Sequence, residues 1–225
     1  MLVVIRLGGS IIASPINTTR INQYVTLLRK FRGDGHRVIV VVGGGILARE
    51  FIKTGSTLGL KEESQDWLAI HVSRLHALLF AMKLGEDGTE KVPTSLSEAA
   101  KALKEGKIVV MGGLKPGMTT DNVAANVAEE VRAQLLIKAT DQEGIYTKDP
   151  RKHRDAEKLD RISFDDLARL LEQNRHQAGV HQILDPVAVE TLQRTKIKTI
   201  VVNGGDPHNL QVAVEGRKVG TIITE

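Results

Sequence analysis

Short runs of apolar residues recur at wide intervals along the chain, mostly without any alternation of apolar and polar positions. Valine and isoleucine are frequent in these runs, which occupy residues 2–7, 38–42, 108–111, 135–139, 199–202 and 221–223. Such runs are typical of strands that are buried on both faces of a parallel sheet. The pattern therefore predicts that these segments are strands of one central sheet.

Between these runs, apolar residues return at the three- and four-residue spacing of amphipathic helices. Helices are predicted over residues 18–31, from about 46, and over 67–84, 95–104, 121–131 and 163–171. The apolar stripe of the first consists of Ile21, Val25, Leu28 and Phe31. The stripe of 67–84 consists of Leu68, Val72, Leu75, Leu79 and Met82. A serine at the start of 95–104, followed by Glu98, fits a capping box.

Alternating strands and helices predict an α/β fold, a three-layer αβα sandwich with a mainly parallel central sheet. The 225 residues suit one large domain or two lobes that share a core. The most polar stretch, 148–161, is a candidate loop between two halves. It is too short to indicate separate domains, so we expect a single domain over residues 1–225.

Composition excludes several classes of protein. The chain has no cysteine, which rules out disulfides, thiolate metal sites and a cysteine nucleophile. Aromatic residues make up 3%, so a stacking platform for nucleic acid is not expected. No targeting segment or stretch approaching about 20 apolar residues was recognised, so we expect a cytoplasmic protein without membrane contact. The seven histidines, among them His71, His76, His176 and His181, form no ligand set, and no metal site is expected.

Glycines gather where the predicted strands end. The first strand leads to Gly8 and Gly9, the second to Gly43, Gly44 and Gly45, the third to Gly112 and Gly113, and the fourth to Gly144. Glycine lets backbone N–H groups approach a phosphate, and a helix N-terminus adds partial positive charge. A single glycine turn of this kind is explained equally well by phosphate binding and by a tight strand-to-helix turn. Four at successive strand ends indicate a ligand with several phosphates, or two phosphorylated ligands.

Common phosphate motifs are absent, because the chain has no P-loop, no Gly-x-Gly-x-x-Gly and no protein-kinase signature. The chain instead resembles the amino acid kinase superfamily, and within it the archaeal type of uridylate kinase. The segments that carry the resemblance are Leu-Gly-Gly-Ser at 7–10, Val-Gly-Gly-Gly-Ile-Leu-Ala-Arg at 42–49, Asp66 with Ser-Arg-Leu at 73–75, Gly-Gly-Leu-Lys-Pro-Gly-Met-Thr-Thr-Asp at 112–121, Ala-Thr-Asp-Gln-Glu-Gly-Ile-Tyr-Thr-Lys-Asp-Pro at 139–150, and Leu-Asp-Pro at 184–186.

The resemblance implies transfer of a phosphoryl group from MgATP to UMP, in a cytoplasmic homohexamer. It assigns ATP binding to Gly9, Ser10, Gly45, Arg49, Thr140, Asp141, Tyr146 and Asp149. It assigns UMP binding to Gly44, Asp66, Leu114, Lys115, Pro116, Gly117, Met118, Thr119 and Thr120. Catalytic roles fall to Arg6 and to Asp185, which would organise the basic residues around the transferred group. The UMP lobe would span about 1–130 and the ATP lobe about 131–225.

The chemistry agrees with a phosphate acceptor. A UMP phosphate is already ionised at neutral pH, so it needs no general base, and the chain shows no obvious histidine–carboxylate constellation. Two positions depart from the family pattern. Arg6 stands where many relatives have lysine, and Asp141 stands where an amide is usual.

Several of these residues also have simpler structural explanations. Asp66 could stabilise the start of the helix at 67–84, Asp185 could cap a helix that begins with Pro186, and Thr119 could cap the next helix. Two other functions remain open. One is a different kinase of the superfamily, acting on acetylglutamate, aspartate, carbamate or isopentenyl phosphate. The other is a nucleotide-binding or storage protein without catalysis.

Overall fold

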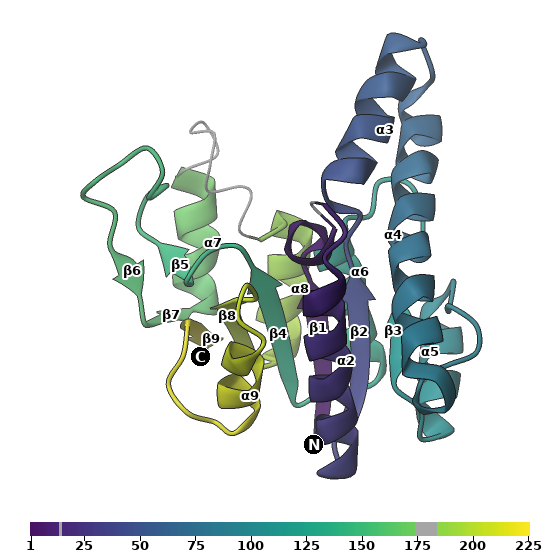
Figure 1. Ribbon diagram of the computed structural model, residues 1–225. Helices are drawn as coiled ribbons and strands as arrows, with labels where there is room; N and C mark the ends of the chain where they lie inside the picture. Colours follow the sequence, from purple (N-terminus) through teal and green to yellow (C-terminus); the bar gives the residue numbers. More distant parts are fainter. Residues whose placement is uncertain (14, 174–183) are drawn as a thin grey trace.

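The computed structural model describes residues 1–13, 15–173 and 184–225, and its centre is a seven-stranded sheet with the order β3-β2-β1-β4-β8-β9-β7 (Figure 1). The strands of this sheet are β1 Leu2–Leu7, β2 Arg37–Val42, β3 Val109–Met111, β4 Leu135–Thr140, β7 Arg161–Ser163, β8 Thr199–Asn203 and β9 Thr221–Thr224. All six predicted apolar runs are therefore strands. From β3 to β8 neighbouring strands are parallel, and β9 pairs antiparallel with β8.

Helices cover both faces of the sheet (Figure 1). They are α1 Gly9–Ile12, α2 Thr18–Gly33, α3 Gly45–Thr57, α4 Glu62–Leu84, α5 Leu96–Lys104, α6 Thr120–Glu130, α7 Phe164–Gln173, α8 Pro186–Thr195 and α9 His208–Val214, with a short 3₁₀ turn η1 at Gly85–Asp87. One core cluster joins the sheet to α5, α6, α7 and α8, and a second joins its other face to α1, α2, α4 and α9. The three-layer sandwich is confirmed.

Alternation along β1 divides its side chains between the two cores. Val3 and Ile5 belong to the cluster with α2 and α4, whereas Leu2 and Val4 belong to the cluster with α6. Both sets are fully buried, which is why the run shows no polar alternation. Arg6 follows Leu2 and Val4 on the face of the sheet that α6 covers, so a charged side chain lies between β1 and that helix.

The prediction for α4 was wrong in two respects. The helix begins at Glu62, so Asp66 lies inside it and not at its start. Three members of the predicted stripe are exposed, with Leu75 at 60%, Leu79 at 40% and Met82 at 71%. The buried face is instead formed by Ile70, Val72, Ser73, His76, Ala77, Phe80, Ala81 and Leu84. The helix is apolar on more than one side, so periodicity alone could not show which stripe faces the sheet.

One described segment, Glu62–Asp87, is long and apolar enough to cross a membrane by length and composition, which the sequence analysis did not expect. It consists of α4 and η1, and 44% of its most apolar window is buried inside the protein. It packs against α3, α2 and β3, as a long core helix does. Together α3 and α4 form a helical hairpin that extends beyond the sheet (Figure 1).

Among the described residues of the second half, four elements were not predicted. They are β7, α9, and the strands β5 Ile145–Tyr146 and β6 Lys158–Leu159, which form a small antiparallel pair apart from the main sheet. The polar stretch 148–161 thus contains the loop between β5 and β6, then β6 itself. Each missed strand has only two or three residues, which is too short to produce a pattern.

A buried hydrogen bond ties α2 to the loop after β8 and gives a test of the fold. The hydroxyl of Tyr24 donates to the carbonyl of Gly204 at 2.8 Å, and the N–H of Gly204 donates to Thr140 at the end of β4. We expect Tyr24→Phe to lower the free energy of unfolding by about 1–2 kcal/mol, because the buried carbonyl loses its donor. Urea unfolding measures this. The control is Tyr146→Phe at the other tyrosine, which is half-buried; it should change the free energy of unfolding by less than about 0.5 kcal/mol. Equal decreases in the two variants would contradict the prediction.

Candidate active site

The first two glycine loops touch each other through their backbones. A Cβ on Gly9 would lie 2.2 Å from the backbone nitrogen of Gly45 and 2.5 Å from the carbonyl oxygen of Gly43. Gly45 has a φ of 63°, a conformation that favours glycine. Glycine is therefore required at 9 and 45 by close approach, and the ends of β1 and β2 are joined into one backbone surface at the starts of α1 and α3.

Behind this surface a histidine holds the second glycine loop. The Nδ1 atom of His76, on α4, lies 3.1 Å from the carbonyl oxygen of Gly43. The ring is buried, and its Nε2 atom has no hydrogen-bond partner among the residues that the structure describes. The histidine comes from a helix distant in the sequence and approaches the loop from its buried side.

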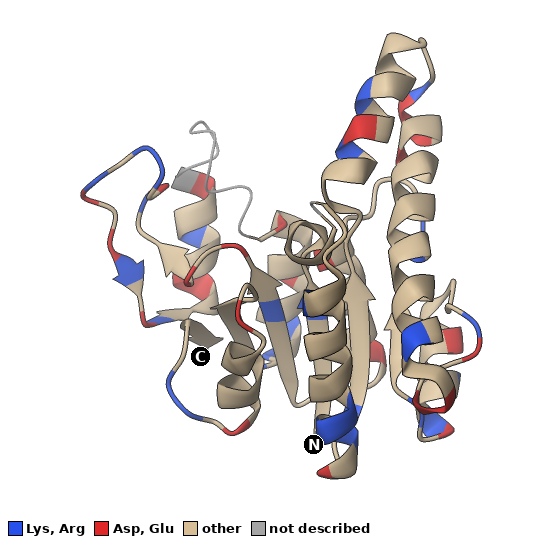
Figure 2. Cartoon of the chain, in the orientation of Figure 1, with Lys and Arg blue, Asp and Glu red and all other residues tan. Residues whose placement is uncertain are grey.

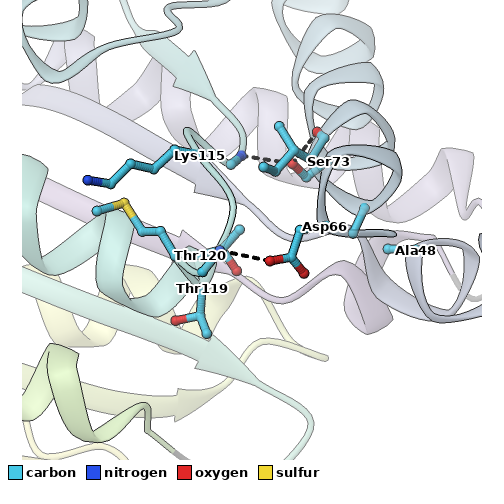
Figure 3. A pocket seen from close by; sticks show the side chains of 12 residues that line it. Ala48, Asp66, Ser73, Lys115, Thr119 and Thr120 are labelled. Atoms are coloured by element: carbon cyan, nitrogen blue, oxygen red, sulfur yellow. Dashed lines mark hydrogen bonds between the residues drawn. The ribbon is translucent and has the colours of Figure 1, made fainter. Parts of the chain in front are cut away.

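A cavity of about 340 Å³ opens beside the glycine loops, between α4 and the loop that follows β3. Its lining includes most of the residues predicted to bind UMP, which are Gly44, Asp66, Lys115, Gly117, Met118, Thr119 and Thr120. Figure 3 shows Ala48, Asp66 and Ser73 on one side of the pocket and Lys115, Thr119 and Thr120 on the other. The volume is in the range of small-molecule sites. Residues that the sequence analysis missed are Ala48, Ala69, Ile70, Ser73 and Gly113.

Helix α4 fixes the loop that closes this pocket. Ser73 Oγ accepts a hydrogen bond from Gly113 N–H at 2.8 Å. The guanidinium of Arg74 donates to the carbonyls of Gly113 and Leu114, both at 2.9 Å. One carboxylate oxygen of Asp66 accepts from Gly117 N–H at 2.7 Å (Figure 3). Asp66 is thus linked to the loop and does not serve as the first-turn carboxylate of its helix.

Two predicted UMP residues, Leu114 and Pro116, are not part of the pocket lining. The side chain of Leu114 packs against the core cluster that includes α6. Both belong to the loop whose neighbouring residues line the pocket.

Beneath the loops lies a cluster of two cations and one carboxylate. Asp121, in the first turn of α6, has one oxygen 2.6 Å from Nε of Arg6, and its other oxygen accepts a hydrogen bond from Lys138. Arg6 Nη2 also donates to Thr120 Oγ1 at 3.1 Å. Burial by itself would raise the pKa of Asp121, but Arg6 and Lys138 hold it below its usual range. The sequence analysis had named Asp121 only as the last residue of the segment 112–121 and had assigned it no role in the site.

Asp185 lies beside this cluster and caps α8. One oxygen accepts from Val187 N–H at 2.8 Å, and the other accepts from the hydroxyl of Thr119. Thr119 in turn accepts from Asn122 N–H at 3.2 Å, so it caps α6 while also lining the pocket. Both capping explanations are confirmed. Among the described residues, the carboxylate that forms ion pairs with Arg6 and Lys138 is Asp121.

The residues predicted to bind ATP follow the sheet edge from β2 across β1 to β4 and beyond. Arg49 is exposed on α3, Ser10 is exposed on α1, and Thr140 ends β4. Gly8 N–H donates to Ala139 at 3.0 Å, which joins the first glycine loop to β4.

Farther along this edge, an arginine balances the carboxylate of Asp141. Arg151 Nη2 lies 2.7 Å from an oxygen of Asp141, and Arg151 N–H donates to Asp149 at 3.0 Å. Tyr146 is on β5 in the same region. Asp141 and Arg151 are both about half exposed. The extra negative charge at position 141 therefore has a local counter-ion.

Within the described ranges, no group of three or more His, Asp or Glu side chains is arranged to hold a metal ion. His176 and His181 lie outside the described residues. His71 is on α4, where its ring contacts Trp67 at 6.0 Å between centroids.

Comparisons with known proteins identify the family. The family model described as "Amino acid kinase family" matches residues 1–203. The uridylate kinase of Methanocaldococcus jannaschii is 40% identical over 99% of both chains, and that of Methanoculleus marisnigri is 42% identical over 99% of this chain and 95% of the relative. The crystal structure of uridylate kinase from Archaeoglobus fulgidus is 37% identical, with a TM-score of 0.89 over 100% of both chains.

These likenesses cover the strands, both glycine loops, the pocket and the Asp121 cluster. A UMP kinase structure from Bacillus anthracis, 21% identical with a TM-score of 0.83, shares the fold. This chain belongs to the amino acid kinase family, in the branch that contains the archaeal uridylate kinases.

Proposed function

We propose that the protein is an ATP-dependent uridylate kinase, which transfers the γ-phosphoryl group of MgATP to UMP and releases UDP and ADP. The observation that carries this proposal is the position of the pocket. Gly44 lines it, and the next residue, Gly45, is packed against Gly9 of the first glycine loop. A nucleotide in the pocket would thus have its phosphate beside the surface proposed for the phosphates of ATP.

The acceptor would be held mainly by the loop after β3 and by α4. One oxygen of Asp66 is engaged with Gly117, and the other, which has no hydrogen-bond partner among the described residues, would accept from a ribose hydroxyl. Gly117, Met118, Thr119 and Thr120 would surround the uracil and ribose, with Leu114 and Pro116 shaping the loop and Lys115 at its exposed side.

The donor would lie across the glycine loops and the end of β4. Gly9, Ser10, Gly45 and Arg49 would contact the phosphates, and Thr140, Asp141, Tyr146 and Asp149 would contact the adenosine. Magnesium would arrive as part of MgATP, and its charge would neutralise the phosphate oxygens. This division would make residues 1–130 the acceptor lobe and 131–225 the ATP lobe.

Phosphoryl transfer requires two anions to meet in line, which positive charge and backbone N–H groups make possible. The ionised phosphate of UMP attacks the γ-phosphorus without a general base. Arg6 lies next to the contact of the two loops and would stabilise charge on the transferred group. Asp121 would hold Arg6, while Asp185 would orient Thr119 at the pocket.

The acceptor specificity is the first test. We expect ADP release from MgATP to be fastest with UMP when UMP, CMP, dUMP, AMP and acetylglutamate are offered separately. The pocket combines Asp66, proposed to bind the ribose, with a loop proposed to surround the uracil. Acetylglutamate has neither group, so it cannot make these contacts. Activity with acetylglutamate and none with UMP would reject the proposal. ATP binding without turnover of any acceptor would favour a storage or binding protein.

Asp66→Asn should raise the KM for UMP about tenfold or more and change the KM for ATP less than about twofold. The amide oxygen can still accept from Gly117 N–H, so the loop stays in place while a charge-assisted hydrogen bond to ribose, worth about 1.5–3 kcal/mol, is weakened. Steady-state kinetics measure both constants. Glu63→Gln, an exposed carboxylate one turn earlier on α4, is the control and should alter neither. Equal effects on the two substrates would contradict the assignment of Asp66.

The protein would act in the cytoplasm as a homo-oligomer, a homohexamer by its resemblance to the family, without nucleic acid or membrane partners. The face of α4 that carries Leu75, Leu79 and Met82 is apolar and exposed in the single chain. Trp67 lies toward the start of the same helix and is 38% exposed. A second copy of this chain would bury this face.

Replacing both Leu75 and Leu79 by glutamate should therefore reduce the oligomer to smaller species, because charges would be buried at the contact. Sedimentation velocity measures the mass in solution. Val187→Glu, an exposed apolar residue on α8, should leave assembly unchanged. An unchanged mass in the double variant would exclude this face as an interface.

A further inference from the structure

Arg6 and Lys138 are direct neighbours on adjacent parallel strands, which is an unusual place for two cations. The register of β1 and β4 pairs Arg6 with Lys138. Their side chains meet Asp121, on the face of the sheet that α6 covers. The side chain of Lys138 is 3% exposed, and the sequence of β4 contains no other charged residue. Figure 2 shows the strands at the centre almost free of charge, with β4 carrying a single blue band.

One carboxylate is shared between these two cations, and it is shared unequally. Lys138 donates a hydrogen bond to one oxygen of Asp121, whereas Nε of Arg6 lies 2.6 Å from the other oxygen without hydrogen-bond alignment. Asp121 therefore compensates one positive charge, and these three side chains together keep an excess of one. Asp185, the other carboxylate that faces Lys138, accepts hydrogen bonds from Val187 N–H and the Thr119 hydroxyl and forms no ion pair with either cation. Buried charges are tolerated only with close partners, so this excess has a cost that needs a reason.

The remaining donors of Arg6 point toward the place where the two glycine loops meet. A Cβ on Gly8 would lie 3.2 Å from Nη1 of Arg6, and a Cβ on Gly43 would lie 3.6 Å from Nη2. Nη2 also donates to Thr120, which lines the pocket. The charge of Arg6 is thus presented between the acceptor pocket and the glycine loops.

We propose that Lys138 is a positioning residue of the phosphoryl transfer. It occupies one oxygen of Asp121 and so prevents that carboxylate from pairing with Arg6 through both oxygens. The positive guanidinium of Arg6 therefore remains directed toward the phosphates. The inference rests on the proposed kinase function. Lys138 does not touch the substrates, and it acts through Asp121 on Arg6. With an uncharged residue at 138, Asp121 neutralises Arg6 and draws it away from the loops.

The charge of Lys138 also depends on pH within a measurable range. Burial lowers the pKa of Lys138 to about 8, against the opposing effect of Asp121. The charged groups that face it are Arg6 from β1, Asp121 from α6 and Asp185 from the cap of α8. As the pH rises through this pKa, Lys138 loses its proton, and kcat/KM for UMP, which reports the free enzyme, should fall. Bound phosphates favour the charged form, so the fall in kcat should come at higher pH.

The test compares wild type with Lys138→Met, which keeps the length of the side chain and leaves one carboxylate with one cation. At pH 7 we expect kcat/KM for UMP to be about tenfold to a hundredfold lower in the variant, and the fall near pH 8 to be absent. Lys198→Met, an exposed lysine beside β8, is the matched control and should reproduce the wild-type profile. A variant with the wild-type rate, or with a lower rate and the same alkaline fall, would overturn the proposal.

A second measurement needs neither a folded variant nor activity. In wild-type protein with ¹³C-labelled lysine, the Cε signal of Lys138 should titrate near pH 8 and move to higher pH when UMP is added. A signal at the position of the neutral amine throughout about pH 7 to 9.5 would overturn the inference, because Lys138 would then carry no charge with which to hold Asp121. Failure of the wild type to phosphorylate UMP would reject the kinase function separately.

Discussion

The contact between the backbones of Gly9 and Gly45 is the constraint on which the site depends. It allows no side chain at either position, so the ends of β1 and β2 have a fixed separation. The acceptor pocket begins at Gly44, one residue away, and Arg6 lies two residues before Gly8. A reaction between two phosphates needs their binding surfaces to be fixed to within fractions of an ångström. A contact made only of backbone provides this, since it has no rotamers to change.

Much of the architecture could be predicted because buried parallel strands leave a plain signal. The six apolar runs are all strands, and the glycine loops at the ends of the first two contact each other at one edge of the sheet. The caps at Ser95, Thr119 and Asp185 were also predicted correctly, because capping is decided by residues only two or three positions apart. The same local logic predicted the stripe of α2, in which Ile21, Val25, Leu28 and Phe31 are all buried.

What escaped prediction depends on contacts between distant residues. On α4, leucine, methionine and phenylalanine occur on several sides, and packing against β2 and β3 decides which of them are buried. The role of Asp121 was missed because its partners are 115 positions before it and 17 positions after it in the chain. A strand register, Arg6 beside Lys138, brings those partners together. The nearest available signal was the lysine itself, a charged residue in the middle of an apolar run.

The same cluster gives a physical reason for arginine at position 6, where the family resemblance led us to expect a lysine. A lysine at position 6 has one compact ammonium group, which could not bind Asp121 and face the phosphates at the same time. The planar guanidinium can approach Asp121 through Nε and still direct Nη1 and Nη2 toward Gly8, Gly43 and Thr120. Lys138 already supplies an ammonium group that binds Asp121. Lys138 therefore holds the carboxylate, and Arg6 directs its positive charge toward the phosphates. Arginine at 6 and lysine at 138 therefore form one arrangement, in which each explains the other.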